Sequence, residues 1–222
     1  MEQLRRPDNG RLAGRTIAIL MESDHVEPEV DYYQRRFAEE GASIEWVTRL
    51  WGRPSMTFTG HEYRRPVTVD GDLEAVDDAR LRSWAALVVP SGMVSDRLRY
   101  TDRADVLAPA VRLLQRAFAE PSVLKGIICH GMWLVAPIPE AVRGRPVTCH
   151  NNLIGDVRNM GAAYTDQDVV VHRDLVTGRS ADVCHLFART LIDLVAARTG
   201  GREVRWWQST VAGRRGPARD HR

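Results

Sequence analysis

The sequence lacks the features that would place the chain in a membrane or in an oxidising compartment. No run approaches 18 apolar residues, so no membrane-spanning helix is expected. The first residues, MEQLRRPDNGRLAG, are polar and charged and have no apolar stretch typical of a secretory signal. Only three cysteines occur, Cys129, Cys149 and Cys184, and none of them is in CxxC spacing. Because three cysteines cannot all pair, a reducing compartment is the simplest interpretation, and we expect a cytoplasmic protein.

Motifs for metals, nucleotides and nucleic acids are also missing. There is no HExxH, no P-loop and no GxGxxG after a strand, so we expect no metal site and no cofactor. A formal net charge of +2 gives no general argument for nucleic-acid binding. The one basic stretch is 200–222, with six arginines against Glu203 and Asp220. It is either a solvated terminus or a site for an acidic partner.

Short apolar runs alternate with helical patterns through most of the 222 residues. The pattern predicts buried strands at 16–21, 43–48, 85–90 and 123–129, helices at 28–40, 105–120, 130–136 and 181–197, and a hairpin at 169–178. Such alternation is typical of an α/β fold in which helices cover both faces of a mainly parallel sheet. We therefore expect a polar segment at 1–14, a single three-layer α/β/α domain at 15–199 and the arginine-rich segment at 200–222.

Three chemically useful residues follow predicted strands, where the working groups of such sheets collect: Glu27, Gly92 and Cys129. In GIICHGMWLVA, Cys129 lies between a buried strand and a helical pattern. A tight turn there would be a nucleophile elbow that exposes the thiol, and the helix end would lower its pKa from about 8.5. The alternative is an inert buried thiol, since free cysteine is among the most buried residue types.

The residues around this turn have two interpretations each. Glu27 precedes Pro28, so it either stabilises the end of the next helix or reaches the turn and, when protonated, donates a hydrogen bond to sulfur. His130 is either a general acid or base or a helix cap. Gly92 is either an ordinary turn glycine or, with the N–H of residue 130, part of an oxyanion hole.

The order of the motifs DHVEPEV, TFTGHEY, VVPSGMVSDRLR, GIICHGMWLVA and VVVHRDLVTGR resembles the ThiJ/PfpI superfamily, in its PfpI-like branch. The resemblance covers 16–197 and implies the fold of class I glutamine-amidotransferase domains. It also implies that Cys129 is the nucleophile, that Glu27 is its hydrogen-bonding carboxyl and that His130 follows it. The backbone donors would be Gly92 and His130.

Two further positions carry expectations from the resemblance. Asp96 matches an acidic residue that orients the histidine across a subunit interface, which implies a homodimer or a higher homo-oligomer. Ser91 stands where the family has the first of two glycines, so the oxyanion site could gain a hydroxyl. We also expect Trp133, with Trp51 and Phe58, to enclose the substrate.

The resemblance implies a cysteine-dependent enzyme for a small-molecule substrate, a hydrolase or lyase of the glyoxalase, deglycase or isonitrile-hydratase kind. Cys129 would attack an electrophilic carbon. A second hypothesis is a redox-sensing or stress-protective protein that uses oxidation of Cys129. A third is a peptidase. We expect neither a nucleic acid nor a membrane as a partner.

Overall fold

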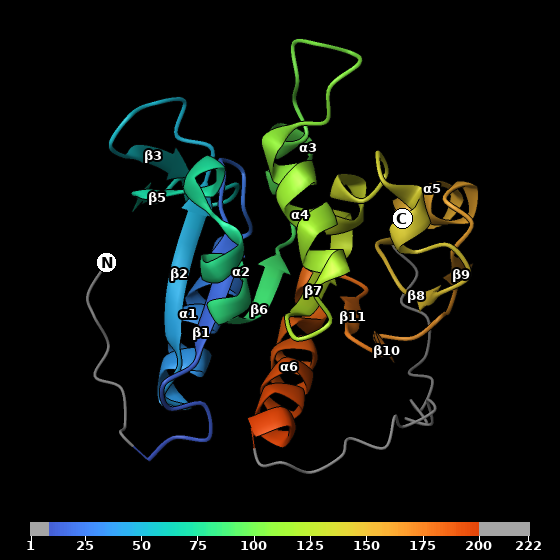
Figure 1. The fold of residues 1–222 in the computed structure, drawn as a ribbon. Coiled ribbons are helices and arrows are strands. Elements are labelled where there is room, and N and C mark those ends of the chain that lie inside the picture. Colours follow the sequence, from blue (N-terminus) through green and yellow to red (C-terminus); the bar gives the residue numbers. More distant parts are fainter. Residues whose placement is uncertain (1–8, 200–222) are drawn as a thin grey trace.

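A seven-stranded sheet forms the centre of the molecule in the computed structural model, which describes residues 9–199 (Figure 1). The strand order is β10-β11-β7-β6-β1-β2-β5. Within the described residues, β10 pairs antiparallel with β11, and all other neighbouring strands of this sheet pair parallel. The strands are β1 Thr16–Leu20, β2 Ser43–Thr48, β5 Gly71–Asp72, β6 Trp84–Val89, β7 Leu124–Ile128, β10 Val169–His172 and β11 Leu175–Gly178.

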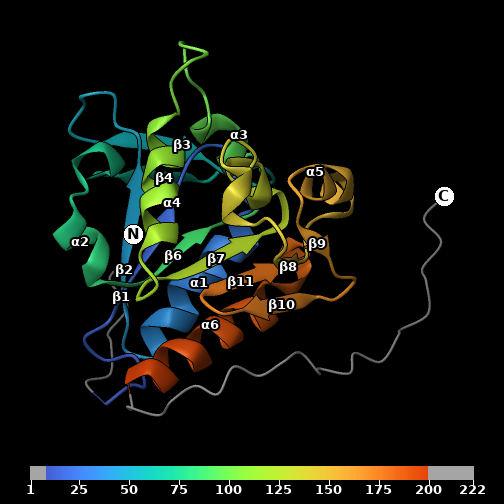
Figure 2. The same ribbon diagram turned by 45° about the vertical axis from the view of Figure 1, so that its right-hand side comes forward.

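Helices cover both faces of this sheet (Figures 1 and 2). Alternate strand residues point to opposite layers, because side chains in a strand alternate between faces. Ile17 and Ile19 of β1 pack with α1 (Glu27–Glu39) and α6 (Cys184–Thr199). Ala18 and Leu20 pack with α2 (Asp78–Ser83), α3 (Val94–Leu98) and α4 (Pro109–Ala119). The structure confirms the predicted α/β fold with a mainly parallel sheet.

The start of α6 lies close to the carboxyl ends of β7 and β11. Phe187, in the first turns of α6, packs over Gly126 of β7 and Gly178 of β11. Gly178 in turn pairs with Ile128, the last residue of β7. The residue that follows Ile128 therefore sits beside the beginning of α6.

The central strands and α1 lie within a residue or two of their predicted bounds, because buried strands are marked by continuous apolar runs. The hairpin at 169–178 is confirmed, with Arg173 in the left-handed region (φ +59°) at its turn. Three helices differ from the prediction. The helix expected at 181–197 starts with the 3-10 turn Ala181–Val183 and becomes α-helical at Cys184, ending at Thr199. The helix expected at 105–120 begins at Pro109, a residue suited to the first helical position, and the segment after β7 is the 3-10 helix η2, Cys129–Leu134.

Smaller elements fill the long connections. The connection between β2 and β5 holds an antiparallel pair, β3 and β4. A second small pair, β8 and β9, flanks α5 on the other side of the molecule. These elements are β3 Met56–Thr59, β4 Pro66–Val69, β8 Pro146–Val147, β9 Ala163–Tyr164, α5 Ile154–Asn159, η1 Leu73–Ala75, η3 Pro139–Ala141, η4 Asn151–Leu153 and η5 Ala181–Val183.

The described part of the predicted N-terminal segment, residues 9–14, packs against the domain. Leu12 is fully buried, and the guanidinium of Arg11 binds Glu40 and Asp193. The arginine-rich segment 200–222 lies outside the described residues. Between residues 9 and 199, no helix is both long enough and apolar enough to cross a bilayer.

A buried ion pair joins β7 to the β10–β11 turn. Lys125 is fully buried, and its ammonium pairs with Asp174, which also accepts a bond of 2.7 Å from Arg145. Burial lowers the pKa of Lys125, although Asp174 opposes this shift. Removing the carboxylate would leave a buried cation without its counter-charge.

We therefore expect Asp174→Ala to lower the free energy of unfolding by about 3–5 kcal/mol. Lys125→Met should cost much less, because Asp174 keeps Arg145 as its partner. Urea unfolding of the two variants measures the difference. Equal losses of unfolding free energy in both variants would show that the cost of Asp174→Ala does not come from leaving Lys125 buried without a counter-charge.

Candidate active site

Cys129 forms a sharp turn at the carboxyl end of β7. Its φ is +59°, a left-handed conformation that costs an L-residue about 1–2 kcal/mol, whereas Ile128 before it is extended. Gly131 makes the turn possible, since a Cβ there would lie 2.8 Å from the carbonyl oxygen of Val89. The chain thus reverses tightly against β6, and the structure places Cys129 in the predicted elbow.

The sulfur of this elbow is largely covered. Cys129 is only 6% exposed, and its Sγ lies 3.2 Å from Nδ1 of His130. Burial raises the pKa of the thiol, while the N–H groups of His130 and Ala181 act in the opposite direction. The lowering of the thiol pKa expected from a helix end is thus outweighed, because η2 is a short 3-10 turn and the sulfur is buried. The elbow and the buried thiol, posed as alternatives by the sequence, both describe Cys129.

Glu29 is the carboxyl group beside this cysteine. It is 1% exposed, and the N–H of Ser91 donates to its two oxygens at 3.1 and 3.3 Å. Burial raises its pKa to about 7, and the neighbouring Tyr33 and Ser91 limit the rise. An ionised Glu29 raises the pKa of Cys129. A neutral Glu29 would instead offer a proton to the sulfur.

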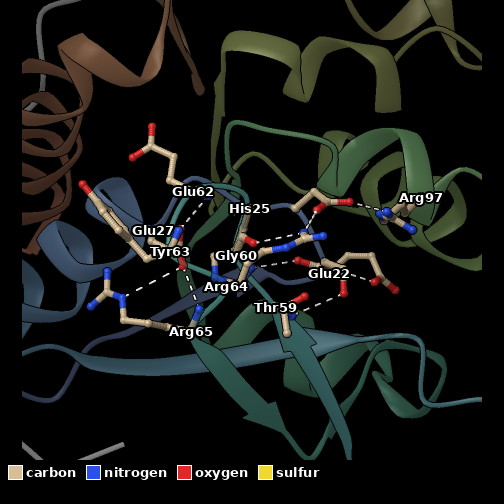
Figure 3. A network of polar contacts seen from close by, with 12 residues as sticks. Glu22, His25, Glu27, Thr59, Gly60, Glu62, Tyr63, Arg64, Arg65 and Arg97 are labelled. Carbon is tan, nitrogen blue, oxygen red and sulfur yellow. Dashed lines mark hydrogen bonds and ion pairs between the residues drawn. The ribbon is translucent and has the colours of Figure 1, made fainter.

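Glu27, the carboxyl expected in this role, has a different one (Figure 3). Its carboxylate accepts backbone N–H groups of Glu62, Tyr63 and Arg65 at 2.9, 2.7 and 2.9 Å. Burial opposes ionisation, but these donors bring the pKa of Glu27 below its usual value. Gly60 permits the close fit, since a Cβ there would lie 2.0 Å from Cδ of Glu27. Glu27 therefore anchors the loop 60–65.

The two glutamates separate because α1 begins at Glu27. Successive helical residues are rotated by about 100°, so side chains two positions apart point to nearly opposite sides. Glu27 consequently meets the 60–65 loop, and Glu29 meets Ser91 at the end of β6. The sequence does not show the rotational phase of this helix, and that phase decides which glutamate faces the elbow.

His130 belongs to a cluster of three rings. Its ring centroid lies 4.5 Å from that of His150 and 5.0 Å from that of Trp133. Burial, and secondarily His150, lower the pKa of His130, so its imidazole is neutral at pH 7 and can accept a proton. Nδ1 of His150 accepts the N–H of Asn152 at 3.3 Å.

His150 was not among the expected site residues. It follows the short strand β8, 20 positions after His130, and only the folded chain brings the two rings together. Trp133, expected to enclose substrate, is half-buried and presents its edge to His130.

Ser91 and Gly92 follow the end of β6. The Ser91 hydroxyl is buried, makes no hydrogen bond of regular geometry, and lies near both Glu29 and Cys129. Gly92 has a φ of +81°, and its turn is held by the bond from the N–H of Met93 to the carbonyl of Asp24. The N–H of His130 is directed at the sulfur. An oxyanion hole formed by Gly92 and His130 stays a prediction.

Asp96 is exposed in the first turn of α3 and faces a surface cavity of about 340 Å³. Its neighbour Ser95 ties this helix to the elbow, since Ser95 Oγ donates to the carbonyl of His130 at 2.7 Å. Trp51 lines the same cavity and is 51% exposed. Phe58 is buried in a separate cluster with Met21, so its expected contact with substrate is wrong. A role for Asp96 across a subunit interface stays a prediction.

The described residues contain no group of three histidine, cysteine or acidic side chains arranged to hold a metal ion. The site is thus defined by an elbow cysteine, a buried carboxyl and two histidines at the carboxyl edge of a parallel sheet. Such a fold and site define a class of α/β proteins with a cysteine elbow.

The chain belongs to the DJ-1/PfpI family, whose profile matches residues 15–194. It is 29% identical to protein/nucleic acid deglycase 2 of Escherichia coli over 184 residues, 82% of this chain and 99% of that one. It is also 29% identical to general stress protein 18 of Bacillus subtilis over 188 residues, 82% and 98% of the two chains. The crystal structure of a ThiJ/PfpI domain protein from Brachyspira murdochii matches with a TM-score of 0.69 at 17% identity, covering 83% of this chain and 98% of that one.

Glu29 predicts a specific dependence of stability on pH. Its folded pKa of about 7 lies above the ordinary 4.5, so the folded state holds the proton to a higher pH than the unfolded state. The stability that the folded state gains from holding this proton is complete below pH ~4.5 and is lost as the pH rises to ~7. The total loss is about 3 kcal/mol.

We therefore expect the free energy of unfolding of the wild type to fall by up to this amount, relative to Glu29→Gln, between pH 4.5 and 7. Urea unfolding at a series of pH values measures it. Glu140→Gln, at an exposed position, should parallel the wild type. Parallel curves for Glu29→Gln and wild type would show that Glu29 titrates normally.

Proposed function

We propose that the protein is a cysteine-dependent enzyme that acts on small reactive carbonyl compounds, with Cys129 as the nucleophile. The observation that carries this proposal is the elbow of Cys129 beside a carboxyl group whose pKa is about 7. The relative named protein/nucleic acid deglycase 2 supports an enzymatic use of this site. The low exposure of the sulfur favours a small substrate over a polypeptide, so a peptidase fits the site less well.

The first step is addition of the thiol to a carbonyl carbon. Sγ transfers its proton to Nδ1 of neutral His130, 3.2 Å away, and forms the C–S bond. The carbonyl oxygen takes the electron pair of the broken π bond and then a proton from the imidazolium, which gives a neutral hemithioacetal. Protonated Glu29 supports the thiolate by donating to sulfur before the attack.

A dicarbonyl substrate would need a second proton transfer. An imidazole removes the proton from the hemithioacetal carbon and returns it to the neighbouring carbon, while the hydroxyl proton moves to the oxygen of that neighbouring carbon. The first carbon becomes the carbonyl of a thioester, and the second carbonyl becomes a hydroxyl. Water then releases a 2-hydroxy acid and the free thiol. The pairing of His130 with His150, at a centroid distance of 4.5 Å, offers two adjacent bases for these transfers.

A protective or redox-sensing function is the second candidate. The N–H groups of His130 and Ala181 and the Ser91 hydroxyl lower the pKa of Cys129, and polar groups of this kind near the sulfur suit an oxidised, oxygen-bearing cysteine. The relative named a general stress protein is consistent with this use.

A homodimer is part of the proposal. Asp96 and the partly exposed rings of Trp51 and Tyr100 share one surface cavity next to α3, and a second copy placed there would bring an acidic side chain towards His130. Residues of this kind, aromatic and arginine side chains together, are enriched in protein interfaces.

The proposal predicts that the wild type converts methylglyoxal to lactate, measured by loss of the dicarbonyl and by appearance of the acid. Cys129→Ala should lower kcat/KM by about 10³-fold or more, because the C–S bond cannot form. Glu29→Ala should lower it by about 10²–10³-fold, because the thiolate loses the buried group that donates a hydrogen bond to it.

Cys149→Ala serves as the matched control, since this cysteine is buried in the cluster on the other face of the sheet and should leave turnover unchanged. Full turnover by Cys129→Ala would rule out covalent catalysis. Peroxide-dependent oxidation of Cys129 without turnover of any carbonyl compound would favour the protective function.

A further inference from the structure

A second cysteine lies on the same side of the sheet as Cys129. Cys184 opens α6 on its inward face, one turn before Phe187 and Ala188, which are fully buried against the sheet. Phe187 packs over the ends of β7 and β11. Cys184 therefore sits one turn nearer to the carboxyl edge, where the elbow is.

The backbone at Ala181 connects the two cysteines. The N–H of Ala181 lies close enough to Cys129 to lower the pKa of its thiol, and the N–H of Cys184 donates to the carbonyl of Ala181. Cys184 is thus a single 3-10 turn away from a backbone group that acts on the sulfur of Cys129.

Both thiols also act on the same buried groups. Each of them is coupled to Glu29, and each contributes to the raised pKa of Tyr33. Cys129 belongs to the hydrophobic cluster that α1 and α6 form, and Cys184 packs against that cluster. Cys149, the remaining cysteine, belongs to the cluster on the opposite face, although a charge on Cys129 also raises the pKa of its thiol.

We propose that Cys184 is the resolving thiol of Cys129 and that hydrogen peroxide converts the two into a reversible intramolecular disulfide. The Cys129 thiolate attacks one peroxide oxygen, the O–O bond breaks, and a sulfenic acid forms while the departing hydroxide takes a proton to become water. The Cys184 thiol then loses its proton, attacks the Cys129 sulfur and displaces hydroxide, which becomes a second water. Two thiols and one peroxide thus give one disulfide and two waters.

This bond would close the active site and keep the cysteine from irreversible oxidation. A sulfenic acid without a neighbouring thiol proceeds with more peroxide to the sulfinic acid, which thiol reductants do not restore. The inference rests on the reactive Cys129 of the proposed function and adds a regulatory role for Cys184.

The test is peroxide titration of the full chain, followed by intact mass and a non-reducing tryptic map. The wild type should lose two hydrogens, yield one peptide that links the segments of Cys129 and Cys184, and return to its starting mass with dithiothreitol. Cys184→Ala should instead gain two oxygens at Cys129, and dithiothreitol should not remove them. Cys149→Ala should behave as the wild type.

Three results would overturn the inference: two added oxygens in the wild type, a linked peptide that contains Cys149, or the same product from Cys184→Ala as from the wild type. Methylglyoxal turnover of the untreated protein separates this from the proposed function. Turnover without a disulfide removes only the role of Cys184, whereas absence of both turnover and any oxidation of Cys129 removes the reactive cysteine itself.

Discussion

The site depends on the left-handed backbone of Cys129. A φ of +59° at a residue other than glycine costs about 1–2 kcal/mol, and the surrounding packing must hold it. Gly131 allows the turn to press against the carbonyl of Val89, and Ser95 fixes the carbonyl of His130 from α3. These contacts bring the sulfur to the edge of the sheet and direct the His130 ring to it at 3.2 Å.

A second constraint is the burial of the site, which couples Cys129 to Glu29. Burial disfavours the charged form of both acids, and each charge would disfavour the other. Glu29 therefore ionises first, near neutral pH, and its charge then opposes ionisation of the thiol. Neutral His130 lies 3.2 Å from the sulfur and provides a base without adding charge, and the ring of His150 stands beside it. This arrangement suits addition to a neutral carbonyl.

Much of the architecture could be predicted from the sequence, because its signals are local. The apolar runs of β1, β6 and β7 and the ICHG turn locate the sheet edge and the elbow. The identity of the site carboxyl could not be predicted in this way. Glu27 and Glu29 flank Pro28 symmetrically, and only the residue at which α1 begins decides which of them faces Ser91.

Other features depend on contacts between distant segments. His150 meets His130 through the fold and not through any spacing in the chain. Burial raises the pKa of Cys129. The extent of this burial depends on tertiary packing, so the lowering of the pKa expected from a helix end was wrong. The loop 60–65, anchored by Glu27, is likewise a tertiary feature (Figure 3).

The most direct test of the coupled pair is the pH dependence of alkylation of Cys129 by iodoacetamide, followed by peptide mass in the wild type and in Glu29→Gln. The account predicts that the wild-type rate rises in two separated steps, because Cys129 and Glu29 titrate together. Glu29→Gln should show one step, at a lower pH than the upper step of the wild type, because the carboxylate that opposes the thiolate is gone. Identical single-step curves in the two proteins would contradict the coupling of Glu29 to Cys129.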